Sequence, residues 1–176
     1  MELDRVRQLS KLLRWIAAII AFNIIVWTLA HIVRPTSMAA MIQDSFGDIS
    51  ANGLPLIKHI NLSILLALAV LPTLRALQML WRLFTLYADG VILNEKAATT
   101  LKSIGRAVLM MAGAALIAPT IAVLLLTFDN PPGQRQFVID YSTSVFALAL
   151  CGGLILTIGW AMVEAARVDA DNKAIV

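Results

Sequence analysis

Two histidines, one cysteine and one arginine inside an apolar run are the side chains of this sequence best suited to chemistry. His31 and His59 flank the same pair of apolar segments and could face each other, which would suit a metal ion or haem. Two ligands do not complete a zinc site, however, and no cysteine or acidic cluster stands beside them. We therefore interpret both histidines as interfacial residues, and we predict neither a metal nor a cofactor.

Arg75 and Cys151 are interpreted structurally. An arginine at the centre of a membrane helix costs roughly 3 kcal/mol on insertion scales, which makes such a residue a functional candidate. Arg75 follows a long apolar run, so its side chain can snorkel to the headgroups, with a buried substrate contact as the alternative. Cys151 has no partner for a disulfide and is predicted to be a buried small residue.

Motifs for catalysis are missing from the sequence. It contains no Ser, His and Asp arrangement at a turn motif, no HExxH, no phosphate-binding glycine loop and no carboxylate pair inside an apolar segment. We predict that the protein is not an enzyme. Every Asp and Glu lies outside the apolar segments or at their ends, which argues against a pump or exchanger of ions.

Four apolar segments carry these side chains. The 176 residues are 60% hydrophobic and 14% charged, whereas soluble proteins are about a quarter charged. Runs of roughly 20 apolar residues match a bilayer core about 30 Å thick, and lipid leaves helices as the natural form of the backbone. We predict an all-α polytopic membrane protein, a single domain over 1–176 with transmembrane helices at 13–33, 57–87, 94–128 and 138–170. The first segment is too long for a secretory signal and is predicted to be retained.

Lysine and arginine in the flanks indicate orientation. With Arg75 left out as intramembrane, ten lie at the N-terminus, between the second and third segments, or in the tail, and three lie in the other two connections. Because these residues resist translocation, we predict cytoplasmic termini and a multi-pass protein of the bacterial inner membrane. The basic residues are expected to attract anionic lipids and not to bind nucleic acid directly.

The second and third helices are predicted to extend into a cytoplasmic helical hairpin. Apolar residues recur at helical spacing on both sides of the turn: Leu77, Leu80, Trp81, Phe84 and Tyr87, then Ala97, Leu101, Ile104 and Val108. Gly90 can adopt the left-handed conformation at a helix end, and Asn94 is a plausible cap for the next helix. The two stripes either close on each other or form a surface for a partner.

Small residues on the fourth segment repeat every four positions. The ladder consists of Ala149, Gly153, Thr157, Ala161 and Ala165, with Gly152 and Gly159 beside it. Ala114, Ala118 and Ala122 do the same on the third segment. Because lipid gives no hydrophobic drive, close approach of small residues holds membrane helices together. We predict that the third and fourth helices pack together, with a homodimer through one ladder as the alternative.

The hairpin and the tail resemble a bacterial family of four-helix integral membrane proteins catalogued as domain of unknown function 2975. The similar positions in the hairpin are Leu80 to Phe84, Tyr87, Gly90, Asn94, Leu101, Ile104 and Gly105. Those in the tail are Glu164 to Arg167, Asp169, Asp171 and Asn172. The resemblance implies no chemistry. It implies a genomic context beside a small helix-turn-helix regulator, and hence a membrane partner of a transcription factor.

The predicted function is therefore a non-enzymatic regulatory partner or sensor, which binds a cytoplasmic helix-turn-helix regulator through its hairpin and tail. The alternative is a membrane protein that handles lipids or small molecules, in export, immunity or envelope stress. The candidate contacts for a partner or lipid are Arg82, Asp89, Lys96, Lys102, Arg106, Glu164 and Arg167.

Overall fold

Four long helices make up the fold. The computed structural model describes residues 2–34, 40, 44, 55–91, 94–131, 133, 135–139 and 142–174. The helices are α1 (Glu2–Val33), α3 (Leu56–Ala88), α4 (Glu95–Thr127) and α5 (Thr143–Ala174), and no strand occurs in the ranges just given. Each helix contains a stretch long and apolar enough to cross a membrane. The predicted all-α polytopic membrane fold is confirmed.

The helix ends differ from the predicted ranges at α1 and α5. α1 begins at Glu2 instead of residue 13, because the basic N-terminal stretch consists of good helix formers and continues the helix outward. α5 begins at Thr143 instead of 138, since residues 135–139 are not helical. The ends of α3 and α4 lie within one residue of the predicted 57–87 and 94–128.

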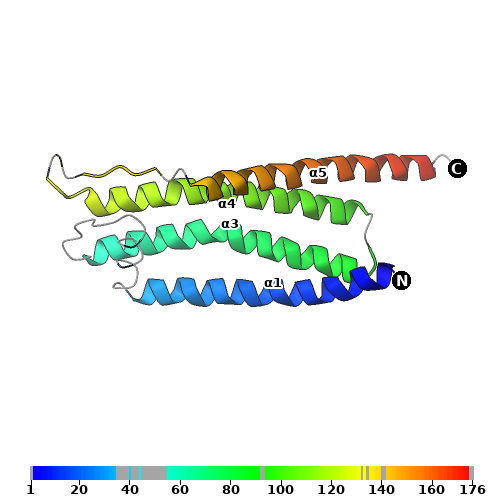
Figure 1. The fold of residues 1–176 in the computed structure, drawn as a ribbon, viewed down its shortest axis with the longest axis horizontal. Coiled ribbons are helices and arrows are strands. Elements are labelled where there is room, and N and C mark those ends of the chain that lie inside the picture. Colours follow the sequence, from blue (N-terminus) through cyan, green and yellow to red (C-terminus); the bar gives the residue numbers. More distant parts are fainter. Residues whose placement is uncertain are drawn as a thin grey trace.

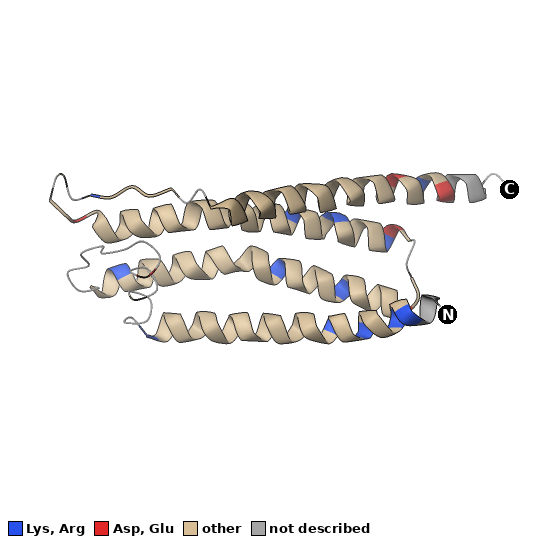
Figure 2. Cartoon of the chain, in the orientation of Figure 1, with Lys and Arg blue, Asp and Glu red and all other residues tan. Residues whose placement is uncertain are grey.

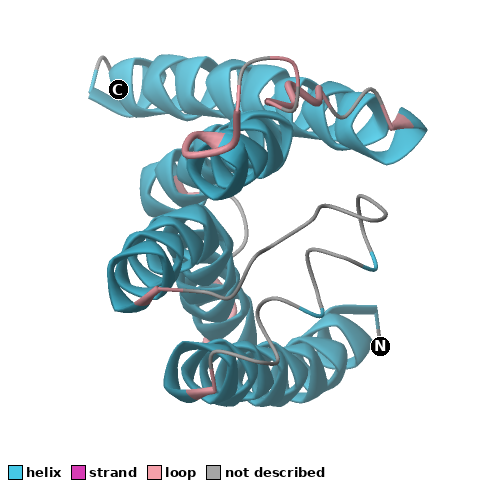
Figure 3. Ribbon diagram, turned by 90° about the vertical axis from the view of Figure 1, so that its left-hand side faces the viewer, coloured by secondary structure: helices cyan, strands magenta, loops and turns pink. Residues whose placement is uncertain are grey.

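The helices pack in chain order. α1 contacts α3, α3 contacts α4, and α4 contacts α5 (Figure 1). Seen from one end they form a curved row, with α1 and α5 at its two extremes (Figure 3). The result is a four-helix bundle that is open along one side. Large parts of each helix surface are left for lipid, and exposed residues such as Phe22, Leu150 and Leu154 lie there.

The α3–α4 pair forms a closed hairpin near its turn. Met79 and Leu83 of α3 are buried against Ala97 and Ile104 of α4. Ala97 and Ile104 belong to the apolar stripe predicted for α4. Met79 and Leu83 lie beside the stripe predicted for α3 and are not part of it. The apolar faces of the hairpin thus pack mainly on each other.

Both predicted signals at the turn are confirmed. Gly90 has a φ of 83°, the left-handed conformation that glycine adopts without a steric penalty. The Asn94 side chain accepts a hydrogen bond of 3.0 Å from the backbone N–H of Lys96 and caps the start of α4. Helix end and helix start are therefore fixed locally, which sets the length of the hairpin.

Candidate functional site

The charged side chains gather at one end of the molecule. This end carries the N-terminus, the α3–α4 turn and the C-terminal part of α5 (Figure 2). We call it the basic end; its exposed cations are Arg5, Arg7, Lys11, Arg82, Lys96, Arg106 and Arg167. No ion pair joins any of these seven to a carboxylate whose position the structure describes. Their charges are therefore available to a ligand or partner.

α1 supports one side of the hairpin. The Trp15 ring meets the Trp81 ring edge-on, with 5.8 Å between centroids and 86° between planes. The Arg14 guanidinium lies over the Trp81 ring, 5.3 Å from its centroid. Farther out, the Arg7 guanidinium reaches the turn at Gly90, where it would lie 2.5 Å from an added Cβ. These contacts hold the end of α3 in place.

α5 supports the other side through backbone-close contacts with α4. A Cβ added at Gly105 would lie 2.5 Å from the backbone nitrogen of Leu156, and one at Gly159 would lie 2.6 Å from that of Lys102. A Cβ at Gly152 would lie 2.9 Å from the nitrogen of Leu109. Because a real Cβ at these distances would clash with backbone atoms, all three positions require glycine. The three contacts share one antiparallel register, which continues to place Arg167 at the level of the start of α4.

The predicted small-residue ladder of α5 is not the face that approaches α4 most closely. Ala149 and Gly153 are half-buried, Thr157 and Ala161 are exposed, and a Cβ added at Gly153 would meet nothing within 4 Å. The close approach of α4 and α5 is instead made by Gly105, Gly152 and Gly159. Two glycines spaced two helical turns apart are the sequence signal for this face, and they stand beside the ladder on α5.

The candidate contact residues fall at two levels. Tryptophan is typical of the membrane–water interface, so we expect the headgroups at the level of the Trp15–Trp81 pair. Arg82, Lys102 and Arg106 lie near this level or slightly deeper. From Trp81 to the end of α3 is about 10 Å at the helical rise, so the turn lies farther toward the basic end than this pair. The residues at this outer level, which we call the tip, are Asp89, Lys96, Glu164 and Arg167.

Exposure separates one candidate from the others. Lys102 is half-buried, and its ammonium group lies 5.8 Å from the Trp160 ring centroid on α5. It therefore contributes to helix packing. The other six candidates are exposed: Arg82, Asp89, Lys96, Arg106, Glu164 and Arg167.

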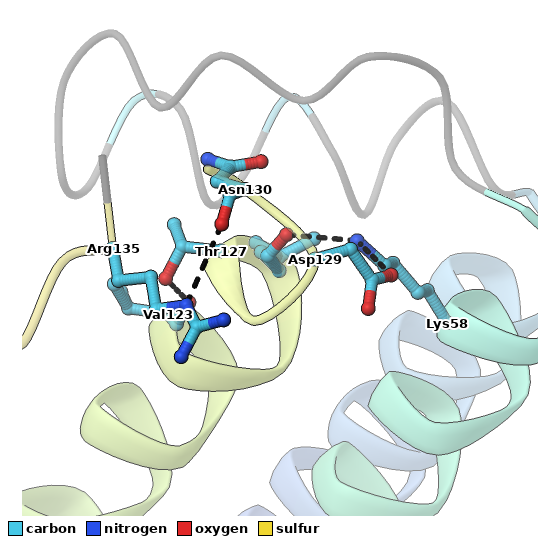
Figure 4. Close-up of polar contacts among 7 residues, drawn as sticks. Lys58, Val123, Thr127, Asp129, Asn130 and Arg135 are labelled. Atoms are coloured by element: carbon cyan, nitrogen blue, oxygen red, sulfur yellow. Dashed lines mark hydrogen bonds and ion pairs between the residues drawn. The ribbon is translucent and has the colours of Figure 1, made fainter. Parts of the chain in front are cut away.

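The opposite end has a polar clamp that the sequence analysis did not anticipate (Figure 4). The Lys58 ammonium donates to the Leu126 carbonyl at 2.9 Å and pairs with the Asp129 carboxylate at 3.1 Å. The buried Thr127 hydroxyl donates to the Val123 carbonyl at 2.9 Å and accepts from the Gln136 backbone N–H at 3.2 Å. Lys58 and Asp129 are distant in sequence, so no local spacing could have indicated the pair.

Another cation at this end is also engaged. The Arg135 Nε group donates to the Asn130 carbonyl at 3.4 Å, and its guanidinium lies 5.4 Å from the Phe128 ring centroid (Figure 4). Lys58 and Arg135 thus have partners within the protein, in contrast to the exposed cations of the basic end.

Each histidine has a structural partner. His59 is buried and donates from Nε2 to the Ile32 carbonyl of α1 at 2.8 Å, which joins α1 to α3. His31 donates from Nδ1 to the Trp27 carbonyl one turn earlier at 2.9 Å. In both cases the nitrogen must carry the proton, since a carbonyl only accepts.

Cys151 is exposed, so the prediction that it is buried was wrong. α5 packs against α4 alone among the major helix contacts, and its remaining surface is therefore uncovered. In a membrane this position meets lipid.

Comparison of the chain with family models, with curated proteins and with solved structures found no match. The resemblance to the family catalogued as domain of unknown function 2975 stays a prediction from the sequence.

Proposed function

We propose that the chain is a non-enzymatic multi-pass protein of the bacterial cytoplasmic membrane whose basic end faces the cytoplasm and binds a soluble regulatory protein. The observation that carries the proposal is the separation of charges by level. Among the exposed candidate contacts, those near the tryptophan pair are the cations Arg82 and Arg106, whereas at the tip the carboxylates Asp89 and Glu164 accompany Lys96 and Arg167.

The mixed charge of the tip favours a protein over lipid as its partner. Anionic headgroups attract cations and repel carboxylates, so a purely cationic surface suits the membrane. A tip that carries both signs is better matched by a protein surface with the complementary pattern. The contacts of α1 and α5 also hold the backbone that carries these side chains, which lowers the entropic cost of binding.

Orientation follows from the same distribution. Ten lysines and arginines belong to the basic end and three to the other, and this bias is typical of a cytoplasmic face. Both termini lie at this end (Figure 1). The resemblance noted from the sequence suggests a small helix-turn-helix regulator as the partner.

One observation favours the alternative of a lipid-handling protein. A groove of about 450 Å³ runs between α1 and α3 and is lined mainly by apolar residues. Binding of a lipid there is compatible with a regulatory role for the tip.

The proposal is tested by purifying the tagged protein from crosslinked native membranes. Reversing two tip charges, with Lys96→Glu and Arg167→Glu, should reduce recovery of the soluble partner at least tenfold, or about 1.4 kcal/mol in binding free energy. Charge reversal juxtaposes like charges, which costs more than removing a contact.

The matched control is Arg135→Glu, which reverses an exposed cation at the opposite end. It should leave recovery unchanged. If the tip variant and the Arg135→Glu control lost partner recovery equally, or if the tip variant recovered as much partner as the wild type, the tip would not be the binding site.

A further inference from the structure

The groove between α1 and α3 has the form of an acyl-chain site. The α1 wall consists of three alanines and Ile25, and larger side chains of α3 form the other wall: Ala17, Ala18 and Ala21 lie opposite Leu71, Leu74 and Trp81. The small side chains of α1 leave the space. From Leu71 to Trp81 the groove extends about 15 Å along α3 at the helical rise. This length equals about half of a 30 Å hydrocarbon core, the depth of one leaflet.

A cation lines this apolar groove. Arg75 is exposed toward it, and its Nη1 donates to the Gln78 Oε1 at 2.8 Å. Gln78 lies one turn nearer the basic end, the direction in which snorkelling was predicted. This partner is neutral, and the structure places no carboxylate of its described part in an ion pair with Arg75. A guanidinium has five N–H donors, so most of them remain for an anion.

A second guanidinium lies beside Trp81, the lining residue nearest the basic end, and we call this end of the groove its mouth. Trp81 lines the groove and also carries Arg14 on its ring. The Arg14 Nε is buried and has no hydrogen-bond partner among the residues with described positions. Because Trp81 lies at the level of the headgroups, the mouth opens where lipid phosphates are found. Arg75 is about 9 Å deeper at the helical rise, within reach of that level for a long side chain.

We propose that this groove binds one anionic phospholipid from the leaflet at the basic end. The phosphate lies between the Arg75 guanidinium and the groove mouth at Arg14, and one acyl chain lies along Ala21 and Leu71. Guanidinium and phosphate form paired, charge-assisted hydrogen bonds, and the apolar walls take the chain. The lipid phosphate supplies an anionic partner for Arg75, whose hydrogen-bond partner Gln78 is neutral. This site does not depend on the partner proposed for the tip.

The test compares lipid retention in the full-length protein. The protein is equilibrated with vesicles of equal parts phosphatidylglycerol and phosphatidylcholine, extracted in mild detergent, and weighed by native mass spectrometry. Wild-type protein should retain one phosphatidylglycerol per chain in preference to phosphatidylcholine. Arg75→Gln should reduce this retention about tenfold or more, since a hydrogen bond to a charged group is lost. Arg135→Gln, which neutralises an exposed cation at the opposite end, should retain the lipid like the wild type.

Two further measurements separate the acyl-chain site from simple charge attraction. Ala21→Leu fills the groove and keeps Arg75, and it should also release the lipid. Added glycerol phosphate, which has the same anion without an acyl chain, should not displace it. Undiminished retention by Arg75→Gln or Ala21→Leu, displacement by glycerol phosphate, equal retention of both phospholipids, or a lipid-free wild-type dimer would each overturn the proposal.

Discussion

Replacing Gly105 by alanine should lower the free energy of unfolding by about 1–3 kcal/mol, the usual cost of overpacking a close contact. The added Cβ would lie 2.5 Å from the nitrogen and 2.6 Å from the Cα of Leu156. These are backbone atoms of a helix and cannot turn aside, so α4 and α5 must separate. Close approach is the main source of attraction between helices in lipid, so the loss extends along the whole contact.

Gly153→Ala is the matched control for this prediction. Gly153 lies on α5 one residue after the interface glycine Gly152, and a Cβ there would meet nothing within 4 Å. Alanine favours the helical backbone over glycine by roughly 1 kcal/mol, so this variant should be neutral or slightly more stable. Reversible unfolding of the purified proteins in mixed micelles measures both. Equal stability of the two variants would contradict the described packing of α5 on α4.

Cysteine labelling should find the two ends of the molecule on opposite sides of the membrane. Cys151→Ser removes the single native thiol, after which Asp89→Cys places one at the tip and Phe137→Cys places one at the opposite end. Both positions are exposed. A membrane-impermeant maleimide should label Phe137→Cys in intact spheroplasts and Asp89→Cys only after lysis, because lysines and arginines resist translocation.

This labelling effect is expected to be close to all-or-none. Labelling of Asp89→Cys in intact spheroplasts would reverse the orientation and remove the cytoplasmic partner from the proposal. Labelling of both positions before lysis would contradict the assignment of the helices as spans between the two ends.

Local signals in the sequence were sufficient for the hairpin. Gly90 and Asn94 each act on the backbone within two residues, so their effect on the ends of α3 and α4 does not depend on tertiary contacts. The start of α1 was misjudged for a related reason. An apolar run indicates where a helix can enter lipid. Leu, Arg, Gln and Lys also favour the helical backbone, so α1 extends past the end of its apolar run.

Helix rotation and long-range pairing could not be read from the chain. Two faces of α5 carry small residues, and only the packing decides that Gly152 and Gly159 meet α4 while Gly153 does not. The Lys58–Asp129 pair depends on how α3 and α4 align over their full length. The division of the candidate contacts into a headgroup level and a tip likewise required the registers of three helices.

A photocrosslinking residue placed at Lys96 in living cells tests the central proposal most directly. Position 96 lies at the tip, and position 135 at the opposite end is the control with a similarly exposed side chain. We expect an adduct with one soluble protein from position 96, lost in the presence of Arg167→Glu and missing from position 135. Adducts with lipid or with a second copy alone, or the same adducts from both positions, would contradict a partner-binding tip.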